Sequence, residues 1–223
     1  IFRKSDGAFM RDGTMFITNQ EFVPYTNPDC ALGFLCTLKV EYSHEITLDP
    51  ELFNDPDGYV IVWERCCRNE AIVNLNVPER NGMTYTLYFP PVVDANGDPF
   101  INSSPRLFPP LSDYACVNQL FYIDFAGTDD DGDSIAYSLA PPLDDSQPND
   151  ANPIVAVPTS TPPPHPIVDF SPGYTLDNMI PGDPALSISN NGFITVTPSK
   201  VGLYVFSVKA EEFRNGIKIG ESR

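Results

Sequence analysis

Proline restricts the fold of this chain more than any other residue type. It occupies 24 of the 223 positions and clusters in the stretches PPV, PPL and TPPPHP. Because proline lacks a backbone N–H and fixes φ, such stretches cannot lie inside helices or central strands. No window of about 12 residues shows a helical period, whereas alternating β-branched and aromatic runs recur between turn residues. The sequence therefore predicts an all-β fold with long proline-rich loops.

Three runs in the first half of the chain predict strands. They span residues 34–48, 58–68 and 83–90, and the segment NDPDG at 54–58 between the first two has strong turn chemistry. In 83–90 the side chains alternate between two faces, as in one sheet of a sandwich. The following segment, 92–105, is polar and turn-rich, and it is the best candidate for a domain boundary.

The second half repeats this strand pattern. Strands are expected in 116–127, 134–139, 191–198 and 202–213, followed by a hairpin turn at Asn215–Gly216. Residues 140–187, rich in proline, aspartate and serine, predict a long wrapped loop with one or two edge strands.

We therefore expect two tandem immunoglobulin-like β-sandwich domains, residues 1–100 and 101–223. The start IFRKSDG has no initiator methionine and no signal-peptide pattern, and the last strand stops at Arg223. We expect an internal fragment, truncated at the N-terminus and in its last strand.

Charge argues against two classes of partner. The chain has 30 acidic and 13 basic residues and a net charge of -17, which repels nucleic acid phosphates and anionic membrane surfaces. No apolar run approaches the roughly 20 residues needed to cross a bilayer. We expect neither nucleic acid binding nor membrane insertion, and the acidity suits a secreted protein surrounded by salt or calcium.

The five cysteines are Cys30, Cys36, Cys66, Cys67 and Cys116. Their spacing does not follow the paired CxxC pattern of zinc sites, so disulfides are favoured, with buried reduced thiols as the alternative. Neighbours on a strand point to opposite faces, so Cys66 and Cys67 are not expected to bond each other easily. Each is expected to take another partner, such as Cys30, Cys36 or a cysteine outside this chain.

The order of several segments resembles the large secreted surface proteins of gliding Bacteroidota, which are exported by the type IX system. The matching segments are 25–48, 58–72, 101–143 and 202–223, and the most specific motif is RCCRN at 65–69. The resemblance implies an extracellular module on a bacterial cell surface, within a protein that often ends in a gliding-motility-associated domain. Its partners would be neighbouring modules, a surface polysaccharide or further copies of the chain.

The chain departs from that family at its cysteines. Family members often begin with a further strand that carries a cysteine, and often have another cysteine in the closing strand, near the position of Lys209. By this comparison Cys116 lacks its usual partner. The resemblance then leaves a first-domain disulfide framework built from Cys30, Cys36, Cys66 and Cys67.

The acidic stretch GTDDDGDSIAYSL at 127–139 is the main candidate site. It fails as an EF-hand, because positions 6 and 12 counted from Asp129 are serine and alanine. In a cadherin-like arrangement the aspartates of a hairpin tip would bind Ca²⁺ together with an oxygen from the inter-domain segment and a carboxylate from the closing strand. The candidate ligands are Asp129, Asp131, Asp133, Asn102 and Glu211. The alternative is an Asp131–Gly132 turn with solvated acids, and a similar turn explains DANGD at 94–98.

Nothing in the sequence singles out an active site. The two histidines, His44 and His165, are not followed by a nucleophile motif, and no phosphate loop or dinucleotide motif occurs. Trp63 offers either a sugar-stacking face or a core side chain. We therefore expect a non-catalytic module of a secreted adhesin or surface filament. The alternative is a carbohydrate-binding accessory module of a secreted enzyme.

Overall fold

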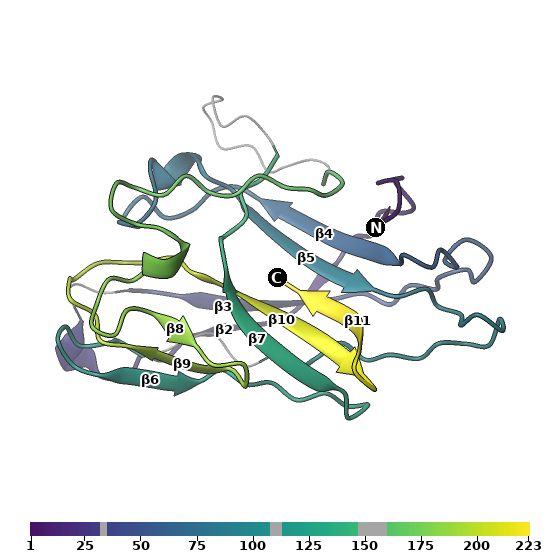
Figure 1. Cartoon of the computed structure of the whole chain (residues 1–223). Coiled ribbons are helices and arrows are strands. Elements are labelled where there is room, and N and C mark those ends of the chain that lie inside the picture. Colours follow the sequence, from purple (N-terminus) through teal and green to yellow (C-terminus); the bar gives the residue numbers. More distant parts are fainter. Residues whose placement is uncertain (32–34, 108–112, 147–159) are drawn as a thin grey trace.

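The computed structural model describes residues 1–31, 35–107, 113–146 and 160–223 (Figure 1). Three short 3₁₀ helices span Pro28–Cys30, Pro78–Arg80 and Leu176–Asn178. The strands are β1 (Phe2–Arg3), β2 (Phe16–Phe22), β3 (Leu38–Ser43), β4 (Tyr59–Arg65), β5 (Met83–Phe89), β6 (Phe121–Asp124), β7 (Ser134–Ala140), β8 (Ser187–Ile188), β9 (Phe193–Val196), β10 (Ser207–Arg214) and β11 (Ile217–Ser222). The predicted all-β class is confirmed.

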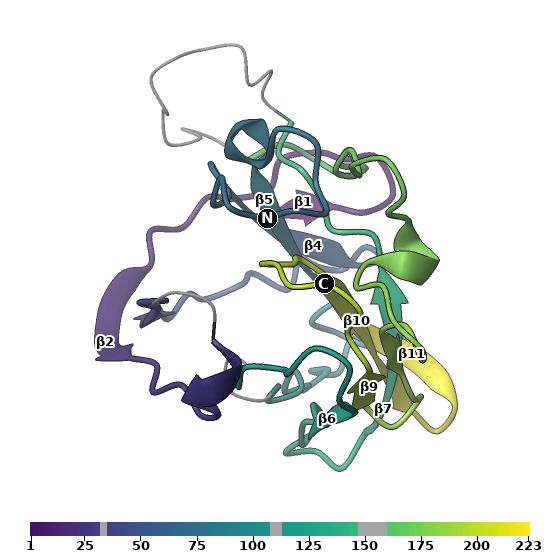
Figure 2. The ribbon, with the colours of Figure 1, turned by 90° about the vertical axis from the view of Figure 1, so that its left-hand side faces the viewer.

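The strands form three sheets. The largest has six strands in the order β1-β4-β5-β11-β10-β7, and the others are the pair β2-β3 and the three-stranded β6-β9-β8. Figure 2 shows β2 well to one side of β4 and β5. An edge-on contact between Tyr42 of β3 and Trp63 of β4, 5.8 Å between ring centroids, links the pair to the large sheet. This layering is consistent with a β-sandwich.

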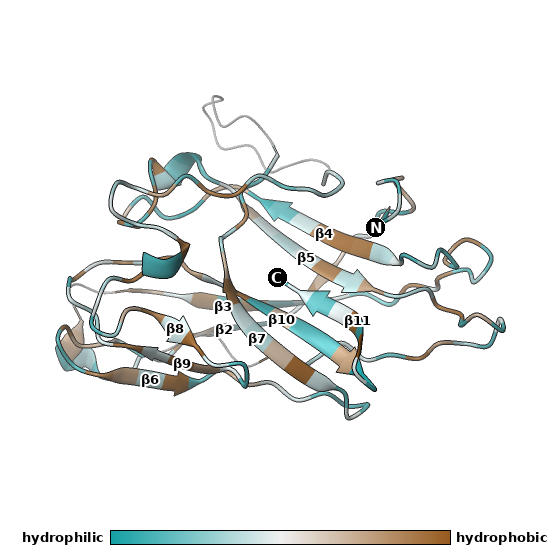
Figure 3. Ribbon diagram, viewed as in Figure 1, coloured by the Kyte–Doolittle hydropathy of each residue, from teal (hydrophilic) through white to brown (hydrophobic). Residues whose placement is uncertain are grey.

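The main core lies between the three-stranded sheet and the β7-β10 part of the large sheet. Its buried members are Met179, Leu186, Ile194 and Val196, and the partly buried side chains around them include residues of β7 and β10. Hydrophobic residues mark the middle of β7 in Figure 3. The alternating pattern of β9, in which Ile194 and Val196 are buried, produces this packing.

A smaller core lies on β4. Val60 and Val62 are buried together with Phe2 of β1, and Tyr88 of β5 packs against them. Alternate residues of β4 are buried, because the intervening side chains face the opposite side of the sheet.

Strands from both sides of residue 100 share the large sheet. β11 pairs with β10 on one side and with β5 on the other, with Glu221 opposite Tyr88 and Ser222 opposite Leu87. Two backbone hydrogen bonds between Thr86 and Arg223, of 2.8 and 2.9 Å, continue this pairing. Two tandem immunoglobulin-like domains are thus not confirmed, and the division at residue 100 stays a prediction.

The long segment 140–187 is partly described. It contains the Leu176–Asn178 turn of helix, an isolated bridge between Leu143 and Ile167, and the first residue of β8. It also supplies the buried Met179 to the main core. Residues 147–159, on which part of the loop prediction falls, lie outside the described residues.

One disulfide joins the two halves of the chain. Cys30 and Cys116 are bonded, with their Cα atoms 4.8 Å apart. Next to this bond Tyr25 stacks on Tyr114 at 4.8 Å between ring centroids. Cys116 is thus bonded to a cysteine of the first half and not to the closing strand, because the segment before Cys30 runs beside the segment before Cys116. Cys36 is exposed and has no disulfide partner in the described part of the chain.

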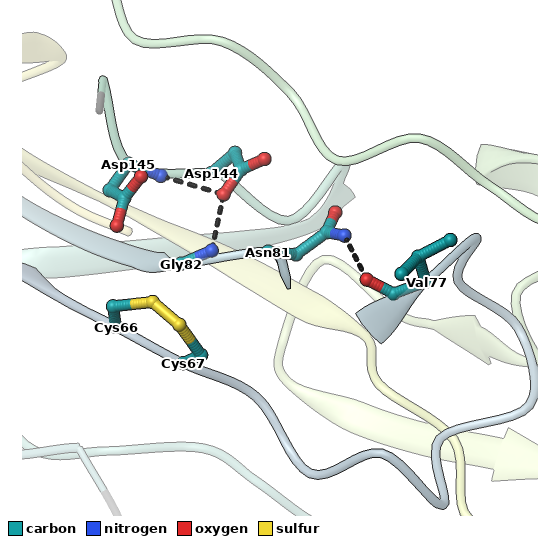
Figure 4. Close-up of a disulfide and its surroundings, with 7 residues drawn as sticks. All are labelled: Cys66, Cys67, Val77, Asn81, Gly82, Asp144 and Asp145. Carbon is teal, nitrogen blue, oxygen red and sulfur yellow. Dashed lines mark hydrogen bonds between the residues drawn. A yellow bond between two sulfur atoms is a disulfide. The ribbon is translucent and has the colours of Figure 1, made fainter. Parts of the chain in front are cut away.

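The other disulfide joins neighbours. Cys66 and Cys67 are bonded to each other across a cis peptide, with a Cα–Cα distance of 3.0 Å (Figure 4). The expectation that these two would not pair is wrong. It assumed a strand, in which consecutive side chains point apart, but β4 ends at Arg65, so the alternation does not extend to Cys66 and Cys67.

The shared sheet predicts that both halves unfold together. Replacing Ile194 by alanine should lower the free energy of unfolding by about 2–5 kcal/mol, because it leaves a cavity in the main core. Trp63, the one tryptophan, lies on β4 in the other half. In urea unfolding, the variant should shift the Trp63 fluorescence midpoint and the far-ultraviolet circular dichroism midpoint equally.

The matched control is Val201→Ala, because Val201 is 56% exposed. Its effect should stay within about 0.5 kcal/mol. A fluorescence midpoint that Ile194→Ala leaves unchanged would show that the halves unfold independently.

Candidate metal centre

The acidic stretch connects two sheets. β6 belongs to the three-stranded sheet and β7 to the six-stranded sheet, and the two strands do not pair with each other. The expectation of a hairpin between them is therefore wrong, because each strand takes its partner from the C-terminal part of the chain, β9 and β10. The stretch is a crossover turn at one end of the sandwich.

Asp129 organises this turn. Its Oδ1 accepts hydrogen bonds from the backbone N–H of Asp131 at 2.9 Å and of Asp133 at 3.1 Å. Gly132 adopts φ of 80°, a left-handed conformation that favours glycine. The other oxygen, Oδ2, is buried and has no hydrogen-bond partner among the described residues. The turn thus leaves one carboxylate oxygen available inside the structure.

Three carboxylates meet at this point. Asp129, Asp133 and Glu212 each offer one oxygen, and these oxygens lie within 4.8 Å of one another. Glu212 lies on β10, opposite Ile135 of β7, and is 1% exposed. In the described part of the chain no other group of three metal-ligating side chains comes as close.

The predicted ligand Glu211 is not part of this cluster. Its carboxylate pairs with Lys209 at 3.0 Å and with Lys218 at 2.5 Å. Consecutive residues of a strand face opposite sides, so the glutamate that reaches the aspartates is Glu212. The sequence holds a signal for this choice, because the apolar residues Tyr204, Phe206, Val208 and Ala210 alternate along this segment, and Glu212 is the next position on the same face.

Two other predicted ligands lie at the edge of the cluster. Asn102 donates a hydrogen bond from Nδ2 to Glu212 Oε1 at 2.7 Å. Asp131 Oδ2 instead accepts the backbone N–H of Ser103 at 2.5 Å. The structure thus brings Asp129 and Asp133 together as predicted, places Asn102 against Glu212, and leaves Asp131 outside the triad.

Arg214 also contacts the acidic cluster, and sequence analysis does not identify it. Its guanidinium binds Asp133 with Nε–Oδ1 at 2.9 Å and Nη2–Oδ2 at 2.6 Å. Nη2 also donates to Asn102 Oδ1 at 2.7 Å. This pairing holds the pKa of the Asp133 carboxyl below its usual range. Arg214 thus neutralises one of the three carboxylates.

Burial disfavours the ionised form of Glu212. Burial raises the pKa of its carboxyl to about 7, against the lowering effect of the Asn102 hydrogen bond, and the nearby Asp129 and Asp133 raise it further. A hard divalent cation would favour the ionised form, because oxygen donors suit such ions. The unpartnered Asp129 oxygen and the buried Glu212 together fit a cation, with water completing the coordination.

The remaining sequence candidates form structural contacts. In DANGD, Asp94 Oδ1 accepts the backbone N–H of Asn96 at 2.8 Å and of Asp98 at 3.0 Å, which makes it a capped turn. Trp63 is 37% exposed and stacks on Tyr85 at 5.5 Å between ring centroids. His44 packs edge-on against Phe16.

Comparisons of the chain with models of protein families, with curated proteins and with solved structures find no match. In the described ranges, no helix is both long and apolar enough to span a bilayer. Functional inference therefore rests on the chemistry of the residues themselves.

The raised pKa of Glu212 predicts a specific pH dependence of stability without metal. In the unfolded chain a glutamate titrates near 4.5, and in the folded protein Glu212 titrates near 7. Protonated Glu212 therefore stabilises the folded state at low pH, and this stabilisation is lost as the pH rises through 7. In chelator, Glu212→Gln should stabilise the protein by on the order of 1–3 kcal/mol at pH 8.5 and have little effect at pH 4.5.

Glu211→Gln is the control, and its expected change in stability has the opposite sign. The Lys218 hydrogen bond lowers the pKa of Glu211, so its ionised form stabilises the folded state above the unfolded pKa. This variant should be less stable than the parent at pH 8.5, and the difference should shrink in acid. Chemical denaturation across pH measures both, and a pH-independent effect of Glu212→Gln would contradict the account.

Proposed function

We propose that this chain is a non-catalytic module of a large secreted cell-surface adhesin or surface filament, stiffened by Ca²⁺ at Asp129, Asp133 and Glu212. The observation that carries the proposal is the set of three carboxylate oxygens within 4.8 Å of one another. One of these residues has a buried oxygen without a hydrogen-bond partner among the described residues.

The covalent chemistry supports a compartment outside the cytoplasm. Two disulfides are formed, Cys30–Cys116 and Cys66–Cys67, and disulfides persist mainly in oxidising environments. The net charge of -17 suits a setting in which cations are abundant. Together with a segment order that resembles that of gliding Bacteroidota surface proteins, this supports an extracellular location.

Calcium is the cation that the donors favour. All three side chains offer carboxylate oxygens, and neither cysteine nor histidine belongs to the cluster. Oxygen ligands select Ca²⁺ or Mg²⁺ over zinc and copper, and Ca²⁺ tolerates the irregular geometry of a turn facing a strand better than Mg²⁺. Several of its ligands would be waters.

The mechanism is mechanical. The acidic turn, β10 and the segment after β5 meet at the cluster, because Asn102 bonds Glu212 and Arg214 bonds both Asp133 and Asn102. A cation held by the turn and by β10 would make their separation more costly. A module in a surface fibre would benefit from such a clamp, because it resists separation of the turn from β10.

One observation favours the alternative, a carbohydrate-binding accessory module. The stacked rings of Trp63 and Tyr85 are 37% and 47% exposed, and aromatic faces bind sugar rings. Glycan-array binding that disappears in Tyr85→Ala would support this function over the mechanical one.

Calcium should raise the thermal stability of the metal-stripped protein. At free Ca²⁺ 100-fold above the dissociation constant the gain is about 2.7 kcal/mol, or roughly 5–10 °C for a chain of this size. Asp129→Asn should abolish most of the shift by weakening a ligand. Calorimetry with and without chelator makes the measurement.

Asp130→Asn is the matched control from the same turn, because Asp130 pairs with Arg106 at 2.5 Å and lies outside the triad. It should keep the calcium response. An unchanged melting temperature of the parent protein on adding Ca²⁺, or equal losses in both variants, would refute the proposed site.

A further inference from the structure

A second site lies on the opposite face of the large sheet. A pocket of about 250 Å³ is lined by Tyr88, Lys218, Glu221 and Arg223. Glu221 is the cross-strand neighbour of both Tyr88 and Glu211. Because Glu211 and Glu212 face opposite sides of the sheet, the pocket and the acidic cluster are on opposite faces.

The pocket gathers positive charge in an acidic chain. Lys4, Lys218 and Arg223 line it, and Glu221 is the one acidic side chain among the described residues of the lining. Lys218 is already paired with Glu211 and Glu221. A concentration of cations is unusual in a chain where acidic residues outnumber basic ones 30 to 13.

Two of these cations have no carboxylate partner among the described residues. The Lys4 ammonium lies 4.4 Å from the centre of the Tyr88 ring, a cation–π contact. Arg223 donates from Nη2 to the Pro141 carbonyl, and its Nε is buried without a hydrogen-bond partner. Lys4 and Arg223 therefore retain capacity to bind an anion.

The buried carboxylate beside His165 is engaged elsewhere. Glu64 Oε1 lies 3.2 Å from His165 Nε2 and accepts the Thr161 hydroxyl at 2.9 Å and the Ser146 hydroxyl at 3.1 Å. His165, which lines the pocket, is held by this network. The Glu64 charge therefore does not neutralise Lys4 or Arg223.

The remaining walls are mostly apolar and of limited size. Val60, Leu143, Pro163 and Pro164 form them together with Thr86. At about 30 Å³ per water, the volume corresponds to roughly eight water molecules, the scale of one sugar ring. A ligand that fits combines an anionic group with C–H faces, since carboxylates pair with lysine and arginine and apolar faces pack on proline and tyrosine.

We propose that this pocket binds one uronic acid residue, the carboxylate-bearing sugar of acidic polysaccharides. The carboxylate lies between Lys4 and Arg223, and the ring packs against Tyr88 and the two prolines. The charge of -17 repels a long polyanion, so the pocket takes a sugar at the end of a chain. This binding is independent of the calcium site.

Titration calorimetry in chelator and at low salt tests the proposal, with glucuronate as the probe and glucose and acetate as comparisons. Glucuronate should bind saturably and at least tenfold more tightly than either, because only it offers both the charge and the ring. Lys4→Gln and Arg223→Gln should each weaken glucuronate binding about tenfold.

Lys200→Gln is the matched control, because Lys200 is exposed and does not line the pocket. It should leave glucuronate binding unchanged. Melting temperatures equal to that of the parent confirm that the variants fold. Acetate binding as tight as glucuronate, no saturable binding of glucuronate, or unchanged binding in Lys4→Gln would each overturn the proposal.

Discussion

The antiparallel contact between β5 and β11 is the interaction on which the rest of the structure depends. It is short, with two paired positions and the two backbone hydrogen bonds between Thr86 and Arg223. It nevertheless joins the first and last parts of the chain into one six-stranded sheet. The segment that follows β5 thereby comes to lie beside β10, where Asn102 meets Glu212. Both faces of this junction carry a candidate site.

The alternation of side chains along β10 separates these two sites. Glu211 and Lys218 pair on the face that bears the basic pocket, whereas Glu212 is buried on the other face beside Asp129 and Asp133. A partly exposed carboxylate paired with lysine and a buried carboxylate thus follow each other in the sequence, and their pKa values are shifted in opposite directions. Burial without a cation opposes ionisation of Glu212, and the proposed Ca²⁺ would remove that opposition.

The features that neighbouring residues determine could be predicted from the sequence. Proline and strand alternation predicted the all-β class, and the glycine-containing acidic turn identified Asp129 and Asp133. The pairing of distant segments leaves no local signature, so neither the shared sheet nor the Cys30–Cys116 bond was predictable. Choosing Glu211 over Glu212 was an error of one residue that the apolar stripe ending at Ala210 could have prevented. Arg214 was missed because its partners lie 81 and 112 residues away.

The central claim is that a cation at the acidic cluster fastens the segment after β5 to the turn and to β10. Hydrogen exchange of backbone amides, with and without Ca²⁺, tests it most directly. The informative amides are those of Ser103, which donates to Asp131, and of Asp133, which donates to Asp129. The account predicts that Ca²⁺ slows exchange at both amides while amides in β2 and β3 change little. Equal exchange rates with and without Ca²⁺ at Ser103 and Asp133 would contradict it.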